Sequence, residues 1–544
     1  MKSTFSQRLI MLGMVAISFS CVQQSANAYV LSTRWDTTAT DGGGLNFGDP
    51  TTVTWSIVPN GTPIQGDPDS DLIAVFDNAF GAGPGGSDLT QRPWFTHFEE
   101  AVGRWSELSG LNYVYEPNDD GVQNATQAGV LGVRGDARIG GSFQDGMGGV
   151  LAFNFFPDVG DMWIDTGDIG NYAAPANDFR FLRNVIMHEL GHGIGISHVE
   201  SNNAGFLMEP FINLGFDGPQ LDDIRAVHRG YGDVFEKANN GNGNDVIGNA
   251  IDLGVSSTGS PIVIGTDGGS LRVERDEVDF VSIDDNGDTD FWSFTIDNPG
   301  TVNIDLMPQG TTYSQGPQGG TQNSFSSLTT SDLTLAFFDS NQTLIATVDN
   351  TNAGSSETIN SLDLAAAGEY YVRVTGTANN IQFYQLTVDF TDSITTIDVD
   401  FDDDNLVDCQ DIDALVAEIA SGGNSAAFDL TGDGLVNDDD LDLWLTDAGA
   451  INLANGNPYL DGDANLDGFV DGSDFNVWNQ NAFTNTPAWC SGDFNADGSV
   501  DGSDFNIWNA NKFTSSDHVA TVPEPSSGIL LIFGALAILR IRRR

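Results

Sequence analysis

The stretch "HELGHGIGISH", residues 188–198, holds three of the six histidines in a chain of 544 residues. On a helix, His188 and His192 lie four residues apart, so both imidazoles project from one face. The glycines that follow would end this helix in a left-handed turn, and the returning chain could bring His198 to the same point. Three protein ligands leave the fourth position of a tetrahedral zinc ion open, as catalysis requires. We therefore predict that these histidines hold one Zn²⁺ ion.

Two further residues complete this motif. Glu189 lies beside the first histidine, where it could take a proton from a water molecule as a general base. The pattern HExxHxxGxxH resembles that of the metzincin metallopeptidases, and "FLMEP" places Met208 where that family has its methionine turn. The resemblance implies a zinc-activated water that attacks the peptide bond, with Glu189 passing the proton to the leaving amine.

The flanking sequence resembles the matrixin catalytic domain over most of residues 50–232. The similar segments are "VTWSIVPNGT" (53–62), "FEEAVGRWSELSGLNYVYE" (98–116), "DGMGGVLAFNFFPD" (145–158), "GDMWIDTGD" (160–168) and "LDDIRAVHRGYG" (221–232). The resemblance implies a zinc endopeptidase acting on protein or peptide substrates. It also implies that the substrate lies along an edge strand around 148–155 and that the loop 209–219 shapes the S1′ pocket. A catalytically inactive adhesion or display protein that keeps the fold is the alternative.

The chain departs from the matrixin pattern at a second metal site. Animal matrixins carry a structural zinc, whose ligand positions here are Arg138, Gly140, Phe153 and Trp163. None of these side chains suits zinc, so we expect that site to be absent. The resemblance implies that nearby calcium carboxylates are kept as Asp145, Asp165 and Asp168.

The sequence predicts a multidomain protein. Residues 29–235 alternate strands and helices, as in an α/β (α+β) metzincin domain, with strands at 51–59 and 148–157 and helices at 94–110 and 221–232. A Gly/Asn-rich linker follows at 236–244. Residues 245–392 show short alternating strands between turns, which predicts an all-β, jelly-roll-like sandwich. Its "GDTDFWSFTI" and "AAGEYYVRVTG" resemble the bacterial pre-peptidase C-terminal domain.

Four loops of one frame occur in two pairs, at 398–450 and 461–514. This is the frame of EF-hand calcium loops, and aspartate at position 12 before a helix resembles the dockerin repeat. The predicted Ca²⁺ ligands at positions 1, 3, 5, 9 and 12 are Asp400, Asp402, Asp404, Asp408, Asp411, Asp429, Thr431, Asp433, Asn437, Asp440, Asp463, Asn465, Asp467, Asp471, Asp474, Asp493, Asn495, Asp497, Asp501 and Asp504. A cohesin-like partner, a calcium-loaded stalk and an acidic spacer remain open, as does a disulfide between Cys409 and Cys490.

Charge and the two ends indicate where the protein acts. The net charge of −57 speaks against nucleic acid and anionic lipid as partners. Residues 1–28 have the pattern of a secretory signal peptide. Residues 521–544, with Pro523, Glu524 and Pro525 before a short apolar segment and arginines, resemble the PEP-CTERM sorting signal. That resemblance implies a transient membrane anchor, cleavage by an exosortase and export to the surface or exterior of a Gram-negative-type bacterium; an ordinary tail anchor is the alternative.

The remaining histidines, His97, His228 and His518, have no partner in the sequence. We interpret them as surface or packing residues.

Overall fold

The computed structural model describes residues 29–516, apart from Gln65, Ala204, 394–398 and Asp403. The predicted signal peptide (1–28), the sorting signal (521–544) and His518 lie outside the described residues. The chain forms two compact units, one ending at Ser393 and the other beginning at Ile394. Among the described residues, no helix has the length and apolar character needed to cross a membrane.

The first part of the chain is built on a five-stranded sheet in the order β4-β3-β5-β7-β6. Its strands are β3 (Thr51–Ile57), β4 (Leu111–Tyr115), β5 (Ala137–Ser142), β6 (Ala152–Asn154) and β7 (Met162–Asp165). All neighbours are parallel except β6, which runs antiparallel to β7 at one edge. An edge strand presents unpaired backbone groups to which an extended peptide can add as a further strand.

The same part of the chain contains the α-helices that carry or support the histidine motif. They are α1 (Leu72–Phe80), α2 (Phe95–Glu107), α3 (Ile169–Tyr172), α4 (Arg180–Gly193) and α5 (Leu221–Tyr231). The helices predicted at 94–110 and 221–232 are confirmed as α2 and α5. The strand predicted at 148–157 is confirmed only as the three residues of β6, because the glycine-rich segment before it forms turns. α4, which carries the histidine motif, packs against α2.

Residues after 245 form a β-sandwich of two five-stranded sheets, as the sequence predicts. One has the order β10-β20-β13-β18 with β11 also paired to β20, and the other has the order β17-β16-β19-β12-β9. The strands are β9 (Ile251–Val255), β10 (Ile262–Ile264), β11 (Ser282–Ile283), β12 (Thr289–Ile296), β13 (Gly300–Gln309), β16 (Leu333–Phe338), β17 (Leu344–Val348), β18 (Glu357–Leu364), β19 (Gly368–Gly376) and β20 (Gln382–Asp392). Alternate residues of these strands fill a core of their own.

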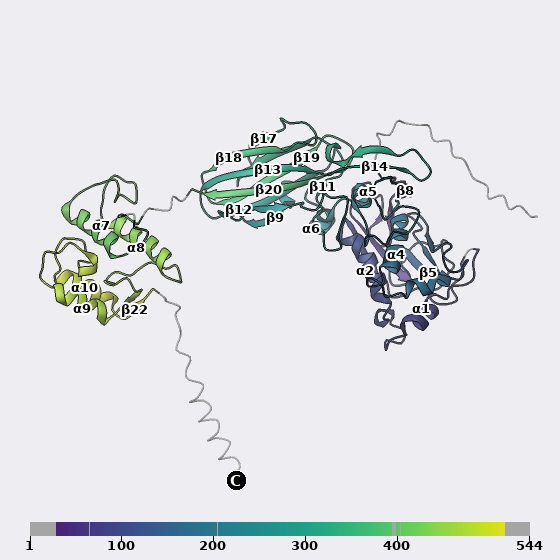
Figure 1. Ribbon diagram of the computed structural model, residues 1–544, viewed down its shortest axis with the longest axis horizontal. Coiled ribbons are helices and arrows are strands. Elements are labelled where there is room, and N and C mark those ends of the chain that lie inside the picture. Colours follow the sequence, from purple (N-terminus) through teal and green to yellow (C-terminus); the bar gives the residue numbers. More distant parts are fainter. Residues whose placement is uncertain (1–28, 65, 204, 394–398, 403, 517–544) are drawn as a thin grey trace, which may run out of the picture. The chain divides into compact units, whose positions relative to one another are not determined.

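The sandwich and the sheet–helix domain are in close contact. A hairpin of β14 (Thr312–Pro317) and β15 (Asn323–Ser326) extends from the sandwich and pairs with β8 (Val199–Glu200) to form a three-stranded sheet (Figure 1). The segment 236–244, interpreted as a linker, includes the single turn α6 (Ala238–Gly241), and its Asn244 is fully buried. The two domains therefore form one packed body.

In the described residues of the second unit there are four α-helices, and each begins in the last part of one of the four repeat loops. They are α7 (Cys409–Ser421), α8 (Asp438–Asn452), α9 (Gly472–Asn481) and α10 (Gly502–Asn511). Buried Trp444 and Trp489 belong to one core shared by both loop pairs. Cys409 and Cys490 form a disulfide, which joins the first loop to the segment before the fourth and resolves the pairing that the sequence left open.

Candidate active site

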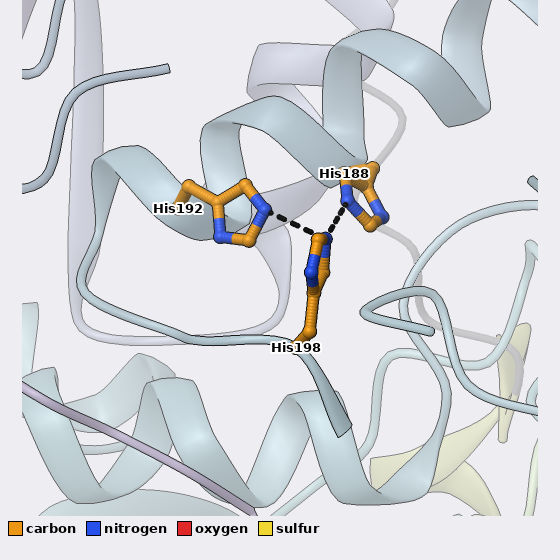
Figure 2. Close-up of side chains that lie close together, drawn as sticks. All are labelled: His188, His192 and His198. Atoms are coloured by element: carbon orange, nitrogen blue, oxygen red, sulfur yellow. Dashed lines mark hydrogen bonds between the residues drawn. The ribbon is translucent and has the colours of Figure 1, made fainter. Parts of the chain in front are cut away.

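The three histidines of the motif meet at one point. His198 Nε2 lies 3.1 Å from His188 Nε2 and 3.1 Å from His192 Nε2, and Figure 2 shows the three rings converging from α4 and from the chain that returns beneath it. One potential ligand atom of each of the three residues lies within 4.8 Å of the other two, close enough for a single metal ion to bind all three. The sequence prediction that these residues come together is confirmed.

The return of the chain depends on Gly195. α4 ends at Gly193, and Gly195 takes the left-handed turn, with φ +103°. A Cβ atom there would lie 1.9 Å from the Thr33 carbonyl oxygen, so no side chain fits. Ile196 then bonds back to Gly191 (N···O 2.9 Å). Of the two glycines that were expected to end the helix, only Gly195 supplies the left-handed residue.

The outer nitrogen of each imidazole has an oxygen partner. His188 Nδ1 lies 2.6 Å from the Leu207 carbonyl and His192 Nδ1 lies 2.7 Å from the Ile196 carbonyl. His198 Nδ1 lies 3.0 Å from Gln318 Oε1 of the sandwich. Because an acceptor at Nδ1 fixes the proton on that nitrogen, the Nε2 lone pairs are left facing one another. This tautomer is the one that binds a metal ion.

The environment of the site fits a zinc ion. Burial lowers the pKa of His188 to about 3 and that of His192 to about 4, which keeps both rings neutral, as metal ligands must be. Burial also raises the pKa of Glu189 to about 8. Its buried Oε2 has no hydrogen-bond partner among the described residues. A carboxyl group in this environment is suited to exchanging protons near neutral pH.

Met208 packs against α4, the helix that carries the first two histidines. It is fully buried, and a Cβ atom on Gly191 would come within 2.3 Å of its sulfur. Asp223 of α5 holds this turn, because its carboxylate accepts hydrogen bonds from Leu207 N (2.8 Å) and Met208 N (3.2 Å). The sequence motif does not reveal this contribution of Asp223, whose only signal is its place early in a predicted helix.

A cleft of about 1100 Å³ opens over the three histidines and Glu189. Residues 148–154 line it, and a substrate bound along this edge stays a prediction. Phe211 and Ile212 of the predicted S1′ loop also line it. Asn184 holds that loop by donating hydrogen bonds to the carbonyls of Asn213 (3.0 Å) and Phe216 (2.9 Å).

The four residues at the positions of the matrixin structural zinc ligands take part in other interactions. Arg138 forms an ion pair with Asp119 (2.6 Å) in a fully buried setting, and both nitrogens Nε and Nη2 bond the carboxylate. Trp163 Nε1 donates to Ser142 Oγ (3.1 Å). Gly140 is buried against the Trp163 ring, leaving no room for a Cβ, and Phe153 packs in the same small cluster.

The three predicted calcium carboxylates of this domain border one loop. Asp165 accepts hydrogen bonds from four backbone N–H groups, of Gln144, Asp145, Gly146 and Gly167. Asp168 accepts from Gly148 N, and its Oδ2 is buried without a partner among the described residues. Asp145 accepts from Val150 N. These three are not among the converging groups found in the described part of the chain, and calcium binding there stays a prediction.

The four repeat loops share one hydrogen-bond pattern. In each, the position-12 aspartate accepts from the backbone N–H of position 9, and position 1 accepts from that of position 6. The position-12 aspartate also accepts from the N–H of position 2 in the first, third and fourth loops, and from that of position 3, Thr431, in the second. In the first loop, oxygens of Asp400, Asp402 and Asp411 lie within 4.8 Å of one another. Burial raises the pKa of Asp463 and of Asp493 to about 7.

A further group of carboxylates was not foreseen from the sequence. Glu236, Asp288 and Asp290 converge within 4.8 Å where the linker meets the sandwich. Burial raises the pKa of Glu236 to about 10. Glu236 is separated from the two aspartates by about fifty positions, so no local spacing signals the group. By contrast, His97 and His228 are buried packing residues, as one of the two expected roles had it.

Two family models match this chain: "Matrixin" over residues 83–232 and "Bacterial pre-peptidase C-terminal domain" over residues 288–376. The chain therefore carries a matrixin-like domain and a pre-peptidase C-terminal-like domain.

Curated relatives match the first of these regions. The hatching enzyme of Paracentrotus lividus is 32% identical over 147 residues, 26% of this chain and 24% of that protein. Human matrix metalloproteinase-15 is 29% identical over 162 residues, covering 27% and 23% of the two chains. Interstitial collagenase of Sus scrofa is 32% identical over 149 residues, covering 27% and 29%. The chain thus spans about a quarter of the length of these relatives.

Solved structures give weaker likenesses. The pre-peptidase C-terminal domain of a Bacillus anthracis collagenase covers 26% of this chain and 93% of that one, at 17% identity and a TM-score of 0.15. Myroilysin covers 37% and 64%, at 11% identity and a TM-score of 0.16. At these TM-scores the likenesses carry no argument.

Proposed function

We propose that this chain is a zinc-dependent endopeptidase that hydrolyses protein substrates. The observation that carries the proposal is the convergence of three imidazoles beside the buried carboxyl of Glu189, inside a cleft bordered by an edge strand. The matrixin-like relatives support a metalloendopeptidase at the level of the family.

The residues of the proposed site have separate roles in metal binding, proton transfer and substrate orientation. His188, His192 and His198 would hold the zinc ion through Nε2. When bound, zinc polarises a peptide carbonyl and makes water acidic near neutral pH. Glu189 takes a proton from the attacking water and delivers it to the leaving amine. The edge strand β6 orients an extended peptide by adding it to the sheet.

The remaining proposals concern the repeat loops and the location of the protein in the cell. Calcium ions occupy the repeat loops, where several carboxylates would otherwise repel one another, and the resulting unit acts as a stalk or binds a cohesin-like partner.

The signal peptide and the sorting signal direct the protein to the exterior of a Gram-negative-type cell, where an exosortase removes the C-terminal anchor. The proposals on the two ends rest on sequence alone.

The Glu189→Gln variant tests the proposed reaction. It keeps the size of the side chain but removes its proton transfer, so we expect kcat on casein or gelatin to fall by about 10²–10⁴-fold with zinc content unchanged. Glu99→Gln, an exposed change on α2, is the matched control and should cleave like the wild type.

Undiminished cleavage by Glu189→Gln would contradict the assigned role. A wild-type protein that binds zinc but cleaves no member of a peptide library would favour the adhesion or display protein instead.

A further inference from the structure

The hairpin of β14 and β15 reaches from the sandwich to the metal-binding segment. Gly316 and Pro317 pair with Glu200 and Val199 of β8 in antiparallel register, and Figure 1 shows β14 running from the sandwich toward β8 and α5. β8 begins at the residue that follows His198. The hairpin therefore lies along the chain between the third histidine and the methionine turn.

The base of the hairpin is fixed by contacts with the domain that carries the histidine motif. Tyr313 is 1% exposed, and its hydroxyl donates to Asp222 Oδ1 at 2.6 Å. Its ring packs edge-on against Phe206, with centroids 5.4 Å apart. Ser314 N donates to Asn203 Oδ1 at 2.8 Å. Because these partners all belong to the matrixin-like domain, the hairpin is held in a defined position relative to the site.

The tip of the hairpin is a tight turn that presents Gln318 to the third imidazole. Gly320 N bonds the Pro317 carbonyl (2.8 Å), and Gly319 has φ +69°, so Gln318 occupies the first central position of the turn. Gln318 Oε1 lies 3.0 Å from His198 Nδ1. His188 and His192 instead use backbone carbonyls of their own domain. Of the three motif histidines, His198 is the one whose Nδ1 has a side-chain acceptor in the part of the chain that the structure describes.

The same residues border the substrate cleft. Pro317 and Gln318 line it beside Val30, Ser197 and His198. A peptide that lies in this cleft would pass the hairpin tip on the His198 side. The sandwich thus supplies a hydrogen-bond partner for His198, the third proposed metal ligand, and part of the wall of the cleft.

We propose that the tip of the β14–β15 hairpin is part of the active site, with Gln318 as a positioning residue for His198 and as a specificity residue for substrate. The inference rests on the proposed zinc peptidase function and assigns to the sandwich a role in it. Gln318 accepts the Nδ1 proton, which holds the His198 ring with Nε2 toward the other two imidazoles.

Zinc affinity measures the first role without relying on activity. All proteins carry Glu189→Gln in the full-length chain, which prevents self-cleavage, and are titrated with Zn²⁺ against a chromophoric chelator. Gln318→Met keeps the length of the side chain but removes the acceptor. Partners of ligating histidines contribute about 10–100-fold to metal affinity, and because Gln318 is exposed to competing water we expect the lower end, about tenfold. Gln318→Glu keeps an acceptor oxygen and should bind zinc at least as tightly as the parent.

Peptide-library cleavage with active protein measures the second role. Gln318→Glu places a negative charge on the cleft wall, so peptides with Lys or Arg at the facing subsite should gain about two- to fivefold in kcat/KM, the range of an exposed ion pair. Gln318→Met should not show this gain. Gln322→Met in the same hairpin is outside the cleft lining and is the matched control for both assays.

The outcomes separate the two proposals. Parental zinc affinity in Gln318→Met overturns the positioning role, and an equal loss in Gln318→Met and Gln322→Met does so too. An unchanged cleavage profile in Gln318→Glu overturns the specificity role. If the parent protein binds no zinc and the wild type cleaves no peptide, the proposed function itself fails.

Discussion

Gly191 lies on α4 between the first two histidine ligands, on the side of the helix that faces Met208. A Cβ atom at this position would meet the Met208 sulfur at 2.3 Å and the methyl carbon at 3.0 Å. Gly191 and Met208 are both buried, so neither residue can move away freely. At the scale of single residues, the packing of Met208 against α4 therefore requires a residue without a side chain at position 191.

Replacing Gly191 by alanine tests this packing. We expect Gly191→Ala to lower the free energy of unfolding by about 1–3 kcal/mol, as overpacked cores do. The matched control is Gly103→Ala on α2, where a Cβ meets nothing within 4 Å. That change should stabilise the protein by about 0.5–1 kcal/mol because alanine favours a helix. Thermal unfolding followed by circular dichroism measures both, and a stabilising Gly191→Ala would contradict the account.

Sequence reasoning located the site residues but not all of their support. The histidines, Glu189 and Met208 could be predicted because the chemistry of zinc fixes their spacing along one chain. Asp223 and Gln318 could not, because each acts through a contact with a segment distant in sequence. Nothing in the local pattern around Gln318 distinguishes it from any turn residue.

Among the secondary-structure elements, the four repeat loops show how one pattern serves two purposes. The position-9 residue caps the helix that follows, and the position-12 aspartate closes a capping box in α7, α8, α9 and α10. Each box satisfies backbone donors that a helix start leaves free. Positions 9 and 12 are also predicted Ca²⁺ ligands, so capping and the proposed cation binding use the same side chains.

Calcium titration tests the proposed role of these loops. Asp493 is fully buried at position 1 of the fourth loop. We expect Asp493→Asn to lower the calcium stoichiometry by one ion and to lower the unfolding temperature of the second unit. Asp439→Asn, exposed and outside the ligand positions, should change neither. Isothermal titration calorimetry gives the stoichiometry, and an equal number of ions in Asp493→Asn and wild type would count against calcium in that loop.

The elements that the sequence predicted best are those with a long regular pattern. α2 and α5 end close to their predicted limits because their apolar spacing is helical throughout. β6 is shorter than expected because backbone turns with glycine at positive φ interrupt the segment before it. The β14–β15 hairpin has weak alternation, and its pairing with β8 is set by the packing of two domains.

At the scale of the whole molecule, one buried hydrophobic cluster spans the matrixin-like domain and part of the sandwich, while the sandwich strands also have a second cluster of their own. Val273, Phe280, Tyr313, Ile381 and Phe383 of the sandwich belong to the same buried cluster as the residues around α4 and α5. The domain boundary predicted near 235–245 therefore does not coincide with a boundary of this cluster. Composition cannot reveal this, because each part also has apolar residues enough for a core of its own.

Calorimetry tests this shared core. We expect residues 29–393 to unfold in one transition with equal calorimetric and van't Hoff enthalpies. Residues 29–235 alone would expose the apolar surface that Tyr313 and Phe383 cover and should unfold at a lower temperature. Two separate transitions in 29–393, or an unchanged melting temperature for 29–235, would show that the domains are independent.

X-ray absorption at the zinc edge on the purified protein tests the central claim most directly. The account predicts one zinc ion per chain with three imidazole nitrogens at about 2.0–2.1 Å, and loss of one of these three scatterers in His198→Ala. A protein without zinc, or a zinc shell that keeps three imidazoles after His198→Ala, would contradict it.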